Sequence, residues 1–303
     1  MKETVNVSLF SYENVTRALA ASAGSVVAMV TFYPLETVRS RLQLEDRESK
    51  NSWKVIKELV KEEGVETLYR GIIPVLESIC TSNFVYFYTF HGLRYLRSNE
   101  SRTAAGDLLF ASIAGIVNVL TTTPLWVVNT RMKMEGVKKN INRKYKSLLD
   151  GLIKIKKEEG LSALWNGTVP SLLLVSNPAI QLMVYESVKR HIQKLTLNGK
   201  LGTVTIFLAA AFSKSVATVL TYPLQLVQTK LRHGHDYKDL SSDVGTIGLI
   251  LYLLRKQGVP GLYKGMEAKL LQTVLTTALM FMTYEKITRL IFGIMGYRNG
   301  IVK

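Results

Sequence analysis

The 303-residue chain has a single cysteine, Cys80, and lacks the motifs by which common enzyme classes are recognised. One cysteine cannot form an intrachain disulfide, so a secreted disulfide framework is excluded. There is no Gly-rich loop ending in Gly-Lys-Ser/Thr, no His-Glu-x-x-His and no nucleophile elbow. The segment from His233 to Asp236 has too few neighbouring ligands for a metal site, and a solvated turn is expected there. We therefore expect no enzyme activity, no metal and no bound cofactor.

Acidic residues are scarce: 23 Asp and Glu stand against 39 Lys and Arg, for a formal net charge of +16. Such a balance can indicate a nucleic-acid-binding protein. Most of the basic residues, however, fall in the segments 39–71, 131–167 and 230–265, which separate long apolar stretches. That distribution is typical of membrane topology and of attraction for anionic solutes. We expect no nucleic-acid partner. Because neither end carries a recognisable targeting signal, targeting is expected to be internal.

The sequence contains a threefold repeat. The phrases PLETVRSRLQ, PLWVVNTRMK and PLQLVQTKLR begin at Pro34, Pro124 and Pro223. A second phrase, EGVETLYRG, EGLSALWNG and QGVPGLYKG, recurs in step with the first. Two phrases that share one period predict three structural units of about a hundred residues each. We expect one domain, 1–303, divided into repeats at 8–100, 101–197 and 198–297.

Each repeat carries two long apolar stretches joined by a more polar segment. Paired membrane helices explain this pattern better than a soluble protein with buried helices, which is the alternative. The mean hydropathy is only +0.14, as expected if each helix turns a polar stripe toward a water-filled interior. The spans are predicted at about 12–42, 72–96, 105–132, 168–192, 201–231 and 266–292. Amphipathic segments that lie at the interface are predicted near 51–63, 147–160 and 244–256.

The proline phrases resemble the signature of the mitochondrial carrier family, solute carrier family 25, and the resemblance covers essentially the whole chain. It implies an all-α membrane protein with six transmembrane helices in three pseudo-symmetric two-helix repeats. Each repeat would carry an interfacial amphipathic helix, and the repeats would surround a central cavity. Alternating access between gates at both ends is implied, with helix kinks at Pro34, Pro124 and Pro223.

Trp126 stands where most of the family has an acid, which resembles a branch associated with NAD, FAD, folate and pyrimidine nucleotides. The phrases SNFVYFYTF, SLLLVSNPAIQ and AKLLQTVL resemble a peroxisomal subgroup of the family. This resemblance implies exchange of coenzyme A, FAD, NAD and AMP or other adenine nucleotides across the peroxisomal membrane. The expected partners are these substrates, membrane lipids and the import machinery for peroxisomal membrane proteins. A mitochondrial inner-membrane nucleotide carrier and a structural protein that kept the carrier fold without transport are the alternatives.

The family's gates join the acid of one repeat to the base of another. Near the proline phrases, the positions carried over pair Glu36 with Asn129, Trp126 with Gln228 and Gln225 with Arg39, with Gln43 as a brace. Because none of these pairs has both charges, we expect this gate to close without an ion pair and with little dependence on salt.

A second gate is implied at the opposite end of the helices. Its positions are His91 and Arg94, Glu186 and Lys189, and Glu285 and Thr288. Only Glu285 with Arg94 keeps both charges.

Polar residues inside predicted membrane helices are candidates for substrate binding, although hydrogen bonds between helices are their structural alternative. Lys214 precedes Gln225 by eleven residues, about three helical turns, so both are expected on the face that lines the cavity. There Lys214 would bind a substrate phosphate; its alternatives are to snorkel or to pair with Glu77. The other candidates are Asn83, Asn177, Gln181, Lys269 and Gln272. The segment 177–181 contains Pro178 and is expected either to shape the cavity or only to kink the helix.

Overall fold

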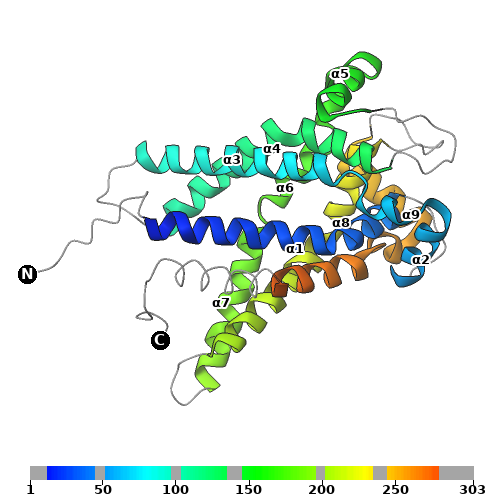
Figure 1. The fold of residues 1–303 in the computed structure, drawn as a ribbon. Helices are drawn as coiled ribbons and strands as arrows, with labels where there is room; N and C mark the ends of the chain where they lie inside the picture. The colour runs from blue at the N-terminus through cyan, green and yellow to red at the C-terminus, as the bar shows by residue number, and fades with distance from the viewer. Residues whose placement is uncertain are drawn as a thin grey trace, which may run out of the picture.

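The computed structural model describes residues 12–44, 52–96, 104–134, 145–195, 202–234 and 244–279. Within these ranges the chain is helical and contains no strand (Figure 1). Four long helices are α1 (Tyr12–Leu44), α3 (Ile72–Leu96), α4 (Ala104–Met134) and α8 (Thr203–His233). The predicted helix at 72–96 has the bounds of α3, and the other three predictions end within a few residues of the observed helices. A further helix runs through residues 266–279.

The helix predicted at 168–192 is interrupted. The structure has α6 (Thr168–Leu174) and, after a turn at Val175 and Ser176, α7 (Asn177–Leu195). Pro178 has no N–H and so cannot donate to the carbonyl of Leu174, four residues earlier. The sequence analysis expected Pro178 either to shape the cavity or to kink this helix, and the chain turns just before Asn177.

Three short helices pack against the second halves of α1, α4 and α8. They are α2 (Ser52–Glu63), α5 (Leu148–Glu158) and α9 (Thr246–Leu262), and the first two are each followed by one 3₁₀ turn, η1 (Val65–Tyr69) and η3 (Ser162–Trp165). Each repeat thereby has its own small core: Val55 and Leu59 of α2 pack on α1, Ile155 of α5 on α4, and Leu249 and Leu253 of α9 on α8. These three cores give each repeat the same local plan.

Within the described residues, three helical segments have the length and apolar composition to cross a membrane. They are Gly106–Met134, Ser162–Leu195 and Val204–His233. The segment Ser162–Leu195 includes the break before α7. The helices α1, α4 and α8 contact one another, and their proline-phrase ends converge on the side where α2 and α9 lie (Figure 1).

Candidate functional site

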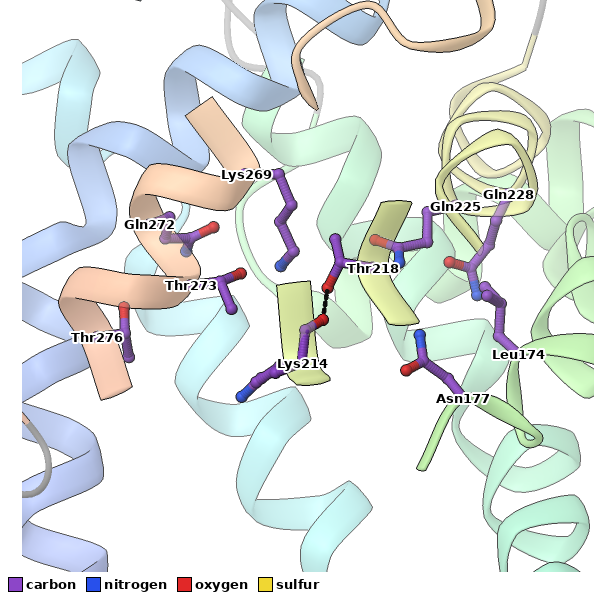
Figure 2. Close-up of a pocket in the computed structure, with 10 residues that line it drawn as sticks. All are labelled: Leu174, Asn177, Lys214, Thr218, Gln225, Gln228, Lys269, Gln272, Thr273 and Thr276. Atoms are coloured by element: carbon purple, nitrogen blue, oxygen red, sulfur yellow. Dashed lines mark hydrogen bonds between the residues drawn. The ribbon is translucent and has the colours of Figure 1, made fainter. Parts of the chain in front are cut away.

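A cavity of about 450 Å³ lies among α6, α7, α8 and the helix 266–279. Its lining residues, drawn in Figure 2, are Leu174, Asn177, Lys214, Thr218, Gln225, Gln228, Lys269, Gln272, Thr273 and Thr276. The lining thus includes two lysines and four side-chain amides, and it has no carboxylate. A cavity of this size is within the range of pockets that take small organic ligands.

Lys214 and Lys269 are the cations of this cavity. Lys214 lies on α8 and Lys269 on the helix 266–279, and both side chains extend into the space between these helices (Figure 2). Neither side chain makes a hydrogen bond or an ion pair within the described part of the chain, and Glu77 does not pair with Lys214; the bond drawn at Lys214 in Figure 2 runs from Thr218 Oγ1 to its backbone carbonyl. The ammonium of Lys269 interacts with the carboxylate of Glu36 only at longer range. As predicted, Lys214 and Gln225 share one face of α8. Two lysines without carboxylate partners make the cavity attractive to anions.

The amides of the cavity are only partly satisfied by the protein. Asn177 Nδ2 and Gln225 Nε2 both donate to Thr221 Oγ1, over 2.8 Å and 3.1 Å. The amide oxygen of Gln272 and the hydroxyl of Thr276 are buried and make no hydrogen bond within the described residues. A buried polar atom without a partner is costly. Gln272 and Thr276 are therefore positioned to bond a ligand or water.

Two of the predicted substrate residues do not line this cavity. Asn83 is exposed on α3. Gln181 borders a separate hollow of about 430 Å³, next to Tyr185 of α7 and Ala210 of α8. The predicted segment 177–181 is therefore divided between the two hollows, with Asn177 in the first and Gln181 in the second.

Glu36 stands at the centre of the contacts that join α1 to α4 near the proline phrases. Its Oε1 atom accepts from Arg39, one turn further along α1, over 2.8 Å, and from Lys133 Nζ of α4 over 3.2 Å. Glu36 and Lys133 are each less than a tenth exposed. The expectation that no ion pair joins the helices at this end was therefore wrong. Lys133, in the second proline phrase, supplies the base.

The three predicted gate pairings do not form in this conformation. Asn129 of α4 is buried, but neither polar atom of its amide has a hydrogen-bond partner within the described residues. Gln228 Nε2 donates instead to Ser171 Oγ of α6, over 2.7 Å. The guanidinium of Arg232 makes a cation–π contact with Trp126, and its Cζ lies 5.8 Å from the centre of the indole.

The contact between α8 and α1 is made by uncharged groups. Gln43 Nε2 donates to the hydroxyl of Tyr222 over 3.0 Å, and that hydroxyl donates to the carbonyl of Lys264 over 2.8 Å. Gln43 is fully buried. Its partner is Tyr222, which immediately precedes Pro223.

The three prolines lie inside α1, α4 and α8. Each proline leaves the carbonyl four residues earlier without its helical hydrogen bond, because proline has no N–H, and in a membrane such a carbonyl needs another donor. The carbonyl of Leu120, freed by Pro124, accepts from Trp165 Nε1 over 2.9 Å. Trp165 belongs to η3, so this bond ties the second repeated phrase to the first.

The opposite gate is described only in part. Glu186 and Lys189 pair within α7 at 3.7 Å, and Lys189 Nζ lies 5.8 Å from the ring centre of Tyr185. The side chains of His91 and Arg94, and the residues Glu285 and Thr288, lie outside the described residues.

Residues of the site that the sequence analysis missed are Lys133, Arg232, Ser171, Thr221 and Tyr222. Two of them had a usable signal. Lys133 and Arg232 each follow a repeat proline by nine residues, the spacing that separates Gln43 from Pro34. The other three emerge only from contacts between elements that are distant in the sequence.

Comparison with known proteins agrees with this architecture. Residues 10–101, 100–196 and 199–294 each match the family model of the mitochondrial carrier protein. The chain is 48% identical over 303 residues to the peroxisomal membrane protein PMP34 of Mus musculus, covering 96% of this chain and 98% of that protein. It is 32% identical to the peroxisomal nicotinamide adenine dinucleotide carrier of Arabidopsis thaliana (89% and 94% covered). It is 30% identical to peroxisomal adenine nucleotide carrier 1 of Glycine max (94% and 92% covered).

The chain belongs to the mitochondrial carrier family, which confirms the resemblance read from the proline phrases. Members of this family are multi-pass membrane transporters, so the chain is a transporter of this family. The peroxisomal proteins among its relatives confirm the predicted location in the peroxisomal membrane.

Proposed function

We propose that this protein exchanges coenzyme A, FAD, NAD and adenine nucleotides across the peroxisomal membrane by alternating access. The observation that carries the proposal is the cavity in which Lys214 and Lys269 extend without carboxylate partners. Phosphate groups are common to all four substrates. A phosphate between two lysines would replace the missing counter-charge and form charge-assisted hydrogen bonds.

The amides of the cavity supply a second kind of contact. Gln225, Gln228 and Gln272 lie on both helices that carry the lysines, so a ligand held by its phosphates would have amides beside it. Side-chain amides present donors and acceptors together, which suits the mixed edge of an adenine or nicotinamide group. The names of two relatives include nicotinamide adenine dinucleotide and adenine nucleotide, which supports these ligands here.

The proposal includes the arrangement in the membrane. Six spans are inferred, formed by α1, α3, α4, α6 with α7, α8 and the helix that begins at 266, with α2, α5 and α9 at the interface. The helix α2 buries Val55 and Leu59 and exposes Trp53, a distribution that suits an interfacial helix. The import machinery for peroxisomal membrane proteins is the inferred partner in insertion, because the chain is a peroxisomal membrane protein.

The test is uptake of labelled coenzyme A, FAD, NAD and AMP by liposomes that contain the purified protein and are loaded with one of these compounds. Lys214→Gln and Lys269→Gln should each lower uptake about tenfold or more, the size expected for losing one charge-assisted bond. Lys157→Gln, at an exposed position of α5, is the matched control and should not change uptake. Thermal shift verifies that each variant is folded.

Two outcomes would overturn the proposal. If no labelled cofactor entered the liposomes, the structural alternative without transport would be favoured. If both lysine variants transported normally, the phosphates would have to bind elsewhere.

A further inference from the structure

The residue nine positions after each repeat proline lies one residue before the end of α1, α4 or α8, at the point where two repeats meet. These residues are Gln43, Lys133 and Arg232. Lys133 Nζ bonds Glu36, which follows the proline of the preceding repeat by two residues. Arg232 lies over Trp126, which also follows the proline of its preceding repeat by two residues. The two contacts are therefore equivalent under the threefold repeat.

The last glycine of the repeated phrase makes room for this residue in the first two repeats. A Cβ atom added at Gly71 would lie 3.1 Å from Lys133 Cγ, and one added at Gly167 would lie 3.1 Å from Arg232 Cγ. In the third repeat, a Cβ at Gly265 would meet Tyr222 and Leu42 instead. Two cationic side chains thus enter their neighbouring repeats along the same path.

The family's usual base positions, five residues after each proline, are not cationic in the second and third repeats. They hold Asn129, whose buried amide has no partner within the described residues, and Gln228, which is bonded to Ser171. Four residues separate these positions from Lys133 and Arg232, which is about one helical turn and about 6 Å along the axis. The cations of this gate are therefore displaced by one turn toward the ends of α4 and α8.

We propose that Lys133 and Arg232 hold the proline-phrase end of the cavity closed by binding Glu36 and Trp126. This inference rests on the proposed transport function, because a gate has meaning only in a transporter. The ion pair is buried, and separating a buried pair is costly. A guanidinium on an indole face is stabilised most when it is desolvated, and Arg232 also donates to Ser171 Oγ over 3.1 Å.

The outward displacement of the gate cations leaves two amides of the third repeat available to line the cavity. Gln225 and Gln228 occupy the usual gate positions of the third repeat, two and five residues after Pro223, and here both line the cavity. Because the gate lies one turn further out, these amides are not used to close it. They extend the polar wall available to a long ligand.

The first experiment is a double-mutant cycle on the ion pair, measured by thermal unfolding in detergent. Glu36→Gln and Lys133→Gln should each lower the melting temperature, and the double variant should lose less than the sum of the two. Lys133→Arg should keep the pair. Asn129→Leu, one turn earlier on α4, is the matched control and should have a smaller effect, since its amide makes no hydrogen bond within the described residues. Additive losses from the two glutamine variants would overturn the pairing.

The second experiment asks whether the contact acts as a gate. Lys133→Gln should raise uptake into empty liposomes relative to exchange by about fivefold or more, because a weakened gate lets the cavity open without a counter-substrate. Lys133→Arg should restore the ratio of the unchanged protein. A merely structural loss would lower both rates in proportion, and that outcome would overturn the gate.

The ratio of uptake into empty liposomes to exchange also tests the contact between Trp126 and Arg232. Trp126→Phe, which keeps an aromatic face, should raise this ratio less than Trp126→Leu, and equal effects would overturn the role of Arg232.

Failure of this inference can be distinguished from failure of the proposed function. A protein that carries no cofactor but shows coupling between Glu36 and Lys133 would refute transport alone. A protein that carries cofactors with an unchanged ratio in every variant would refute the gate alone.

Discussion

The proline-phrase end and the neighbouring cavity treat their buried charges in opposite ways. At the proline-phrase end, Glu36 is bonded to both Arg39 and Lys133, so these three charges have partners within the protein. In the cavity, Lys214 and Lys269 have no such partner within the described residues. A protein interior that pairs its charges can be closed and stable by itself. An interior that leaves cations unpaired depends on water or on a ligand, which is what a binding cavity requires.

The largest expected effect tests this difference directly. Glu36→Leu should lower the free energy of unfolding by about 3–5 kcal/mol, because it leaves Lys133 buried without its partner. Lys269→Met in the cavity should change stability little or raise it, while cofactor uptake falls. Thermal unfolding and liposome uptake of both variants measure the contrast. Similar losses of stability in the two variants would remove the distinction between gate and cavity.

The next effect concerns two glycines of the second repeat. Gly160 and Gly167 both have left-handed φ angles, +91° and +81°, but only Gly167 is closely approached, by the backbone oxygen of Gln228 at 3.1 Å from an added Cβ. Gly160→Ala should cost about 1–2 kcal/mol for its backbone conformation alone. Gly167→Ala should cost about 1–3 kcal/mol more, since the carbonyl cannot move aside easily. Chemical denaturation of both variants compares them, and equal costs would mean that the gate tolerates the added methyl.

A smaller effect is expected at the carbonyl freed by Pro124. Trp165→Phe removes the donor to the Leu120 carbonyl and should lower stability by about 1 kcal/mol. In a Pro124→Ala background the helix can satisfy that carbonyl itself, so the same substitution should then cost less. Thermal unfolding of the four proteins provides the comparison. An unchanged cost in the alanine background would show that Trp165 acts through packing rather than through this bond.

The smallest effect lies outside both regions, at the start of α5. The backbone N–H of Lys146 and the ammonium of Lys154 lower the pKa of Asp150 below its ordinary value. A lowered pKa contributes stability above the unfolded-state value, which is lost as pH falls through the folded-state value. The difference in stability between the unchanged protein and Asp150→Asn should therefore shrink below about pH 4. A constant difference from pH 7 to pH 3 would contradict this assignment.

Much of the fold was predictable because its signals are local. The two repeated phrases established the threefold plan, and the apolar stretches between them located α1, α3, α4 and α8 within a few residues. Among the predicted substrate residues, Lys214, Asn177, Lys269 and Gln272 line one cavity. Helical periodicity alone places Lys214 on the same face of α8 as Gln225. Asn83 and Gln181 do not line this cavity, since their contribution depends on how α3 and α7 are rotated. Pro178 indicated a kink in the helix predicted at 168–192, but the sequence did not show that the helix would stop and restart there.

The sequence alone determined the repeat, the helices and the family, because these follow from residue periodicity and from phrases that recur along the chain. Only the tertiary structure decided which positions of the proline phrases meet. A residue four places further along a helix lies about 6 Å away along the axis and is turned by only about 40°. Asn129 and Lys133 are therefore almost equally oriented candidates for Glu36. The choice between them depends on how α4 and α1 pack, and the structure places Lys133 against Gly71, whose lack of a side chain leaves room for it.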